Sequence, residues 1–176
     1  IAYRNPRNTD KKRYMANVSI AFDILPWLNV SGRAKIDNTN SIFTQKLYAS
    51  SNTTITEGST QGHYTEIRNT DEQIYADVMV NINKTFADNK FSLVANVGAS
   101  INDTKSKELS YRGPIREVGI PNMFTVFDLD KEKSRAQKYG WQEQTQSIFA
   151  SVEMGYKSML YLTVTGRNDW ASQLAG

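Results

Sequence analysis

Long stretches in which apolar and polar residues alternate one by one constrain the fold of this chain more than any other feature. Between Tyr14 and Ile24 the even positions are apolar, whereas the odd positions include Asn17, Ser19 and Asp23. The same alternation recurs in five further stretches, at residues 28–37, 74–83, 91–102, 147–154 and 160–167. Side chains of a β-strand point in turn to opposite faces of the sheet. The sequence therefore predicts six strands, each with one apolar and one polar face.

The connections between these stretches alternate between short and long. Tight turns are expected near Pro26, Asp88 and Lys157, which would join the strands as three hairpins. Long polar links are expected at about residues 38–71 and 103–141. The charge-rich segment 128–138 lacks apolar residues at helical spacing, so it is predicted to be loop. The connections predict an all-β, antiparallel, up-and-down sheet with short turns on one side and long loops on the other.

The composition narrows the classes of protein that fit such strands. Only 39% of the 176 residues are apolar, below the roughly 45–50% of an average soluble domain, so the chain has little material for a core. The absence of cysteine excludes disulfide scaffolds, thiolate metal sites and cysteine nucleophiles. No apolar run approaches the ~18 residues of a transmembrane helix. The net charge of +3 comes from scattered residues without a recognition motif, so nucleic acid is not an expected partner.

Two kinds of protein contain two-faced strands, namely soluble β-sandwiches and transmembrane β-barrels. The alternation itself does not distinguish them, because an apolar face suits either a protein core or lipid. The length of the strands favours the barrel. About 11 residues, when tilted, cross the hydrocarbon layer of a bilayer, whereas strands of globular proteins commonly have 5 or 6 residues. The long loops on one side alone also match bacterial outer-membrane barrels.

Charged and aromatic residues favour the barrel as well. Mid-strand charges occur on the polar faces alone, as a water-filled lumen allows: Arg33, Lys35, Asp77, Glu153 and Arg167. Aromatic residues gather near strand ends, as in interfacial girdles: Tyr14, Trp27, Phe86, Phe91, Tyr156 and Tyr161. We therefore expect lipid to contact the odd positions of 91–101 and the even positions of the first three strands: Val18, Ile20, Val30, Ile36, Val78 and Ile82. A soluble β-sandwich that binds carbohydrate or acts as an adhesin is the alternative.

No group of residues in the chain predicts catalysis or metal binding. His63 is the only histidine, and residues 58–62 have threonine where a Gly-x-Ser-x-Gly motif requires serine. The acidic stretch 128–132 resembles the start of a calcium loop, but Lys133 stands where the sharp-turn glycine belongs. We therefore predict a protein that is not an enzyme, has no catalytic residues and needs no metal ion or cofactor.

The last strand carries the most specific pattern in the chain. Residues 161–172, Tyr-Leu-Thr-Val-Thr-Gly-Arg-Asn-Asp-Trp-Ala-Ser, closely resemble the stretch YL-x-V-T-G-R-N-D-W-S-S of SusC/RagA-like TonB-linked outer-membrane transporters of Bacteroidetes. The centre of this motif is Gly166, Arg167, Asn168, Asp169 and Trp170. Residues 12–19, 26–33, 120–124 and 148–160 are similar to further stretches of that family, so the resemblance spans nearly the whole chain. Ala16 and Ala171 are small departures, from glycine and serine.

The resemblance implies a nutrient transporter. In that family a barrel of 22 strands encloses an N-terminal plug, a SusD-like surface lipoprotein covers the outer mouth, and TonB supplies energy. Glycans or peptides are imported. Residues 1–176 would then be part of a single barrel domain in a bacterial outer membrane, contacting lipid and lipopolysaccharide, with TonB engaged through a plug that is not recognisable here. A passive porin is the alternative, because it would share every feature of the strands.

Two groups of residues near the long links are candidates for contacts outside the barrel. The basic residues Arg4, Arg7, Lys11, Lys12 and Arg13 precede the first alternating stretch, where lipopolysaccharide head groups would lie or the loop would be solvated. The aromatic residues of the links are predicted to stack on sugar rings or to contact the lid: Tyr111, Phe124, Phe127, Tyr139 and Trp141. Packing of the loops on themselves explains these aromatic residues equally well.

Overall fold

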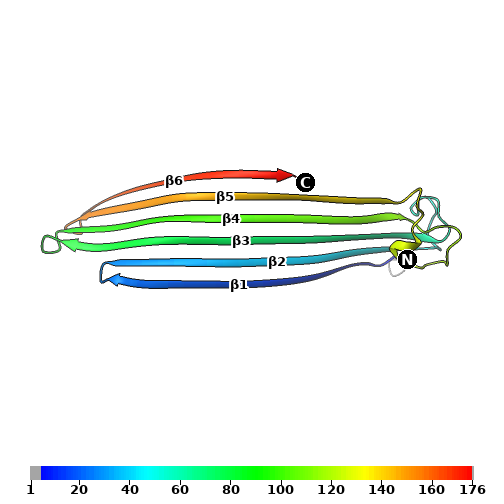
Figure 1. The fold of residues 1–176 in the computed structure, drawn as a ribbon, viewed down its shortest axis with the longest axis horizontal. Coiled ribbons are helices and arrows are strands. Elements are labelled where there is room, and N and C mark those ends of the chain that lie inside the picture. Colours follow the sequence, from blue (N-terminus) through cyan, green and yellow to red (C-terminus); the bar gives the residue numbers. More distant parts are fainter. Residues whose placement is uncertain (1–4, 176) are drawn as a thin grey trace.

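The computed structural model describes residues 5–175 of the chain and shows one sheet of six antiparallel strands. The strands lie side by side in chain order (Figure 1). Their bounds are β1 Arg7–Leu25, β2 Leu28–Tyr48, β3 Gly62–Phe86, β4 Phe91–Pro114, β5 Arg135–Tyr156 and β6 Leu160–Ala175. A single 3₁₀ turn, η2 Val126–Asp128, lies between β4 and β5. The predicted all-β, up-and-down architecture is confirmed.

The connections have the predicted one-sided arrangement. Short turns at 26–27, 87–90 and 157–159 close the three hairpins at one end of the sheet, and loops 49–61 and 115–134 lie at the other end (Figure 1). Two of the short turns use left-handed backbone, with φ of 52° at Asp88 and 62° at Asn89, and 52° at Lys157. Asp and Asn adopt this conformation more readily than most residues, which suits them to a tight hairpin.

The strands extend further toward the long loops than the alternation predicts. β2 and β3 stay paired as far as Tyr48 and Gly62, inside the segment 38–71 expected to be a link. β4 and β5 likewise stay paired as far as Arg112 and Arg135, inside the segment 103–141. Both expectations were wrong because polar residues beyond the alternating stretches occur on both faces, with apolar residues such as Ile42 and Phe43 scattered among them, so no amphipathic pattern marks the strands there. The ladder of backbone hydrogen bonds continues there, although the pattern of side chains no longer marks it.

The register aligns like residues across the whole sheet. One transverse row on one face is Phe22, Val30, Val80, Val97, Ala150 and Gly166. A row on the opposite face, three residues further along each strand, is Ser19, Arg33, Asp77, Ser100, Ser147 and Asp169. We call these sides the apolar face and the polar face. The even positions of β1–β3 share the apolar face with the odd positions of β4, as the sequence predicts.

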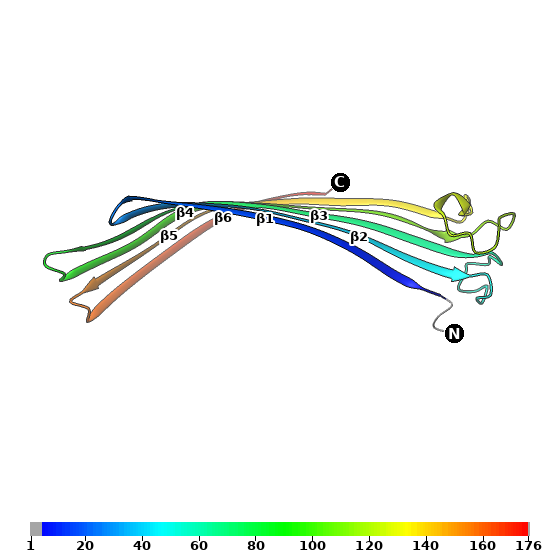
Figure 2. The same cartoon turned by 90° about the horizontal axis from the view of Figure 1, so that it is seen from below.

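Among residues 5–175 the sheet is a single bowed layer of strands, with no second sheet packed against it (Figure 2). Large apolar side chains on the apolar face are exposed, for example Phe22 at 66% and Val78 at 51%. Leaving so much apolar surface in water is unfavourable by about 25 cal/mol for each Å², so the face requires an apolar environment from outside these residues. Residues 5–175 include no helix that is both long enough and apolar enough to cross a membrane.

Candidate functional site

An aromatic cluster marks the short-turn edge of the apolar face. The rings of Phe86 and Phe91 stack at 5.7 Å between centroids, and Phe91 packs against Tyr156 at 5.0 Å. The Nζ of Lys84 lies 4.6 Å from the centroid of the Trp27 ring. Aromatic rings with lysines beside them are typical of the boundary between lipid and water.

One expected member of this cluster lies on the other face. Tyr161 pairs with Gly155 on the polar face, and its ring carbon Cε1 lies 2.8 Å from the place that a β-carbon on Gly155 would occupy. Tyr161 therefore lies at the end of β6, as expected, but on the polar face and not with the aromatic cluster of the apolar face. Tyr161 is an odd-numbered residue of β6, whereas the even-numbered residues of that strand lie on the apolar face. The ring instead covers a glycine, which stabilises a site without a side chain of its own.

The apolar band crosses the strands obliquely. Its edge toward the long loops is formed by Ile36 and Ile74 in one row, by Ile101 two residues nearer the short turns, and by Ile148 a further two residues nearer them. The edge therefore descends by a little more than one residue per strand. With ~3.4 Å per residue and ~4.8 Å between strands, this slope corresponds to roughly 40°. Strands of transmembrane barrels are tilted by about 35–45°, so a band lying level in a bilayer would give the strands that tilt.

The polar face carries ion pairs between neighbouring strands. The guanidinium of Arg33 on β2 donates to Asp77 on β3, with an Nη2 to Oδ2 distance of 2.9 Å. The Asp77 side chain is 1% exposed, although the sheet has a single layer. Arg13 on β1 donates from Nε to Asp37 on β2 at 2.8 Å. The prediction that mid-strand charges project from the polar face is confirmed, and pairing across strands satisfies them.

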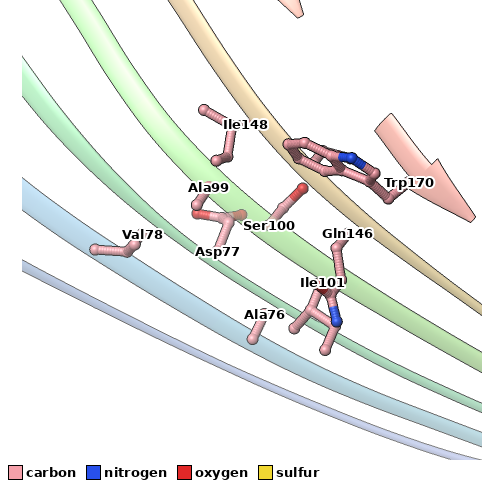
Figure 3. Close-up of a pocket in the computed structure, with 10 residues that line it drawn as sticks. Ala76, Asp77, Val78, Ala99, Ser100, Ile101, Gln146, Ile148 and Trp170 are labelled. Carbon is pink, nitrogen blue, oxygen red and sulfur yellow. The ribbon is translucent and has the colours of Figure 1, made fainter. Parts of the chain in front are cut away.

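The family motif at 166–170 is divided between the two faces of β6. Arg167 and Asp169 lie on the polar face, where Arg167 donates to Asp169 at 2.8 Å and to Ser147 Oγ at 3.1 Å. Trp170 lies on the apolar face beside a hollow of about 470 Å³ over Ala76, Ala99 and Ile101 (Figure 3). Gly166 and Asn168 have the same parity as Trp170. These contacts shape the wall, and none of them gathers the motif into a single binding site.

The aromatic residues predicted to bind substrate or lid do not form one cluster. Tyr111 is half-buried on β4, and Tyr139 and Trp141 lie on β5, in strands that were expected to be loop. The register places Tyr139 and Trp141 on the polar face and Tyr111 on the opposite side. Phe127 is 91% exposed in loop 115–134.

Phe124 packs within the molecule. Its ring makes an edge contact with Tyr48 at 5.0 Å and approaches Tyr64 at 6.3 Å, and Lys46 Nζ lies 5.6 Å from its centroid. This contact matches packing of the loop on the strand ends. A role of the five aromatic residues in binding stays a prediction.

The basic residues near the start of the chain do not form one patch either. Arg7, Lys11 and Arg13 are at odd positions of β1, which lie on the polar face. Lys12 is at an even position, which lies on the apolar face. They belong to β1, which begins at Arg7, and not to a loop before it. Arg4 lies outside the described residues.

Acidic side chains in loop 115–134 accept hydrogen bonds from within the same loop and so stabilise its conformation. Asp128 accepts from Arg116 Nη2 at 3.1 Å, and Asp130 Oδ1 accepts from the backbone N–H groups of Glu132 and Lys133 at 2.9 and 3.2 Å. Across residues 5–175 no three acidic or histidine side chains are grouped so as to hold a metal ion.

A hydrogen-bonded triad on β3, in which Tyr64 and Glu66 are buried and Arg68 is exposed, stabilises the long-loop end. Tyr64 donates its hydroxyl to Glu66 at 2.6 Å, and Arg68 Nε donates to the other oxygen of Glu66 at 2.6 Å. Burial, together with the bond to Glu66, raises the pKa of Tyr64 to about 12. Burial alone would raise the pKa of Glu66, but the bonds from Tyr64 and Arg68 outweigh it and hold that pKa below its ordinary value. The carboxylate is therefore charged and fully engaged near neutral pH.

A cavity that sequence reasoning missed lies on the polar face at the long-loop end. It has a volume of about 560 Å³, and strands β1–β4 and loop 49–61 contribute to its lining. His63 lies at its wall and is 5% exposed, with Nε2 at 3.7 Å from Glu57 Oε1. Burial lowers the pKa of His63, and the nearby Arg112 adds to this effect while Glu57 opposes it. No local motif signals the cavity, because its residues come from five segments that only the strand register brings together.

Comparison with known proteins gives matches among solved structures. No protein-family model and no curated protein matches the chain. The RagAB peptide transporter matches with a TM-score of 0.80 at 16% identity, and the RagAB peptide importer in its "open-open" state matches with a TM-score of 0.78 at 15% identity. Each match covers 97% of this chain and 18% of the other chain. BauA, the ferric preacinetobactin receptor of Acinetobacter baumannii, matches with a TM-score of 0.61 at 12% identity, over 97% of this chain and 26% of the receptor.

These matches agree with the resemblance found in the sequence. The chain spans about a fifth of the length of the RagAB chains it matches, and six strands are fewer than the ~8 that close the smallest membrane barrels. The chain has the fold of a segment of the barrel wall of the SusC/RagA-like TonB-linked transporters that its sequence resembles.

Proposed function

We propose that residues 1–176 form part of the barrel domain of an outer-membrane transporter of the SusC/RagA type. In this proposal the apolar face contacts lipid, the polar face lines the lumen, and the long loops lie outside the cell. The observation that carries the proposal is the oblique apolar band on a single-layer sheet, which fits a tilted barrel wall in a bilayer. The whole transporter would include further strands, because six strands cannot close a barrel alone, and a plug, as the family resemblance implies.

The proposed activity is energised uptake of a nutrient too large for passive diffusion. TonB would act through the plug, and a SusD-like lipoprotein would cover the outer mouth, as the resemblance at 166–170 suggests. The proposed cargo is an oligosaccharide or a peptide, and the RagAB proteins matched in structure are described as a peptide importer and transporter. The solved structures that match are described as a peptide transporter, a peptide importer and a receptor, which supports our proposal of a transporter and not an enzyme.

Uptake by cells that express the full-length transporter tests this proposal. We expect entry of labelled oligosaccharides or peptides to stop when TonB is removed. Entry that continues without TonB would favour the passive porin, which shares the same wall. The β-sandwich alternative predicts instead that the isolated chain is soluble and folds cooperatively without detergent, which an open sheet edge and an exposed apolar face oppose.

Deletion of loop 115–134 tests the proposed outer surface. Pro114 and Arg135 bound this loop, and the pair Arg112 and Arg135 keeps the strand ends adjacent. A short Gly-Ser connection can therefore replace the loop without removing strand residues. We expect the barrel to insert normally and substrate capture to fall. Normal capture in this variant would show that the loop does not contact substrate or lid.

A further inference from the structure

A row of arginines crosses the polar face at the level of the cavity. The row consists of Arg7, Gln45, Thr65, Arg112 and Arg135. Within residues 5–175 none of these three arginines takes part in an ion pair, whereas Arg13, Arg33, Arg68, Arg116 and Arg167 do. Arg112 and Arg135 are direct partners on neighbouring strands. Like charges placed opposite each other destabilise a sheet, so this row is suited to a bound anion.

The cavity beside the row also contains a buried polar atom without a partner. His63 Nδ1 makes no hydrogen bond among the described residues, although the side chain is 7% exposed. The carboxylate of Glu57 faces Nε2 and can only accept, so the ring proton belongs on Nε2 and Nδ1 is left as an acceptor. Burial of an acceptor without a donor is unfavourable. A ligand that brings an N–H or O–H group to Nδ1 would satisfy it.

The rest of the lining is apolar. Phe43 and Leu47 on β2, Ile67 on β3 and Ile55 in loop 49–61 face the same space. Its volume of about 560 Å³ lies within the ~300–1,000 Å³ of small-ligand pockets. A ligand for this cavity therefore combines a negative charge, a hydrogen-bond donor and an apolar group. A sugar acid provides the first two but has no apolar side chain.

The backbone holds the cavity in place. Gly62, the first residue of β3, has φ of 117°, and a β-carbon there would lie 2.6 Å from the carbonyl oxygen of Leu47. Loop 49–61 is tied to loop 115–134 through Ser59, whose Oγ donates to the carbonyl oxygen of Ile115 at 2.6 Å. Thr56 and Ser59 are both buried. Ile55 and Glu57 are therefore positioned over the sheet before any ligand binds, which reduces the cost of ordering on binding.

We propose that this cavity binds the C-terminal carboxylate of a peptide that ends in an apolar residue. Arg7 and Arg112 donate to the carboxylate, and His63 Nδ1 accepts the N–H of the terminal residue. Phe43, Leu47, Ile55 and Ile67 surround its side chain. The inference rests on the proposed function, in which this face lines the lumen near its outer mouth, and it narrows the cargo to a peptide.

Equilibrium binding to the purified full-length transporter in detergent tests the proposal. The probe is fluorescently labelled Ala-Ala-Leu, compared with the same peptide carrying a C-terminal amide and with galacturonate as competitor. We expect the amide to bind roughly 10- to 100-fold more weakly, the range for loss of a charge-assisted hydrogen bond. The R112Q variant should bind the free peptide more weakly by a similar factor and should bind the amide as the unmodified transporter does. Galacturonate should compete poorly.

A matched control separates the site from general electrostatics. Lys107 lies on the same strand as Arg112, but its odd position places it on the opposite face of the sheet. K107Q therefore removes a positive charge without changing the cavity. We expect K107Q to bind the free peptide as the unmodified transporter does. Thermal unfolding, monitored by circular dichroism, checks that both variants fold.

Several outcomes would overturn the subsite. They are equal binding of the free peptide and its amide, equal weakening by K107Q and R112Q, and competition by galacturonate as strong as that of the unlabelled peptide. No binding at all would also overturn it, including the case in which an acidic side chain elsewhere in the barrel or plug fills the cavity. Uptake in cells lacking TonB is measured separately. Loss of TonB dependence would overturn the proposed function, whereas a failed binding experiment with TonB-dependent uptake would overturn the subsite alone.

Discussion

The sheet has two halves that share one backbone ladder but differ in the surroundings they require. Near the short turns, one face is apolar and the other is polar, and aromatic rings line the edge at Phe86, Phe91 and Tyr156. Near the long loops, polar residues occur on both sides, and apolar residues such as Phe43 and Leu47 line a cavity on the polar face. Amphipathic alternation in this protein therefore marks the part that needs lipid. It does not mark the extent of the strands.

A charge placed on the apolar face should give the largest difference between the two halves. Val78 lies in the apolar band, whereas Thr70 lies on the same side of the same strand beyond it. We expect Val78→Arg to destabilise the full-length barrel by about 2–4 kcal/mol, the cost of arginine near the middle of a bilayer, and Thr70→Arg to cost about 0–1 kcal/mol. Denaturant titration in lipid vesicles measures both. Equal costs for the two variants would contradict the proposed position of the bilayer.

A substitution at Gly62 should affect the long-loop half alone. The positive φ and the close carbonyl of Leu47 make Gly62→Ala strained, at a cost of about 1–3 kcal/mol. Hydrogen exchange should accelerate in loop 49–61 and at the ends of β2 and β3, with no change near the short turns. Gly166 provides the control, because its β-carbon would meet no atom within 4 Å. Acceleration throughout the sheet would show that the two halves unfold as one unit.

Loss of an aromatic ring should have a smaller effect that again differs between the halves. Phe91→Leu removes two ring contacts at the edge of the apolar band, and we expect about 1 kcal/mol of global stability to be lost. Phe124→Leu removes the contact with Tyr48, and we expect only faster exchange in loop 115–134. Vesicle titration combined with hydrogen exchange distinguishes the two results. A global loss for Phe124→Leu would indicate that the loop supports the barrel.

The smallest expected effect is a dependence on pH that is confined to the long-loop half. Burial lowers the pKa of His63, so the unfolded segment binds a proton more readily than the folded one. The contribution of His63 to the free energy of unfolding is therefore fully present above the ordinary histidine pKa of ~6.5, and it falls as the pH drops below that value. Amides of loop 49–61 should therefore exchange faster at pH 5.5 than at pH 7.5 after correction for intrinsic rates. His63→Gln should remove this difference, and its persistence would point to another titrating group.

The half of the sheet near the short turns was predicted well because a local rule governs its sequence. A strand with lipid on one side and water on the other must alternate residue by residue, so the runs from Tyr14 to Ile24 and from Phe91 to Ile101 show strand, face and hairpin partner in the sequence itself. The motif at 166–170 added the resemblance to a transporter family.

The long-loop half depended on tertiary structure. Residues 38–48 and 103–114 pair as strands through backbone hydrogen bonds that do not depend on amphipathic side chains. The cavity unites Arg7, His63 and Arg112, which are far apart in the chain and which only the register of four strands brings together. The sequence by itself therefore determined the six two-faced strands and the order of short and long connections, because each follows from near neighbours along the chain. Tertiary structure alone decided where the strands end and which distant charges face a common space.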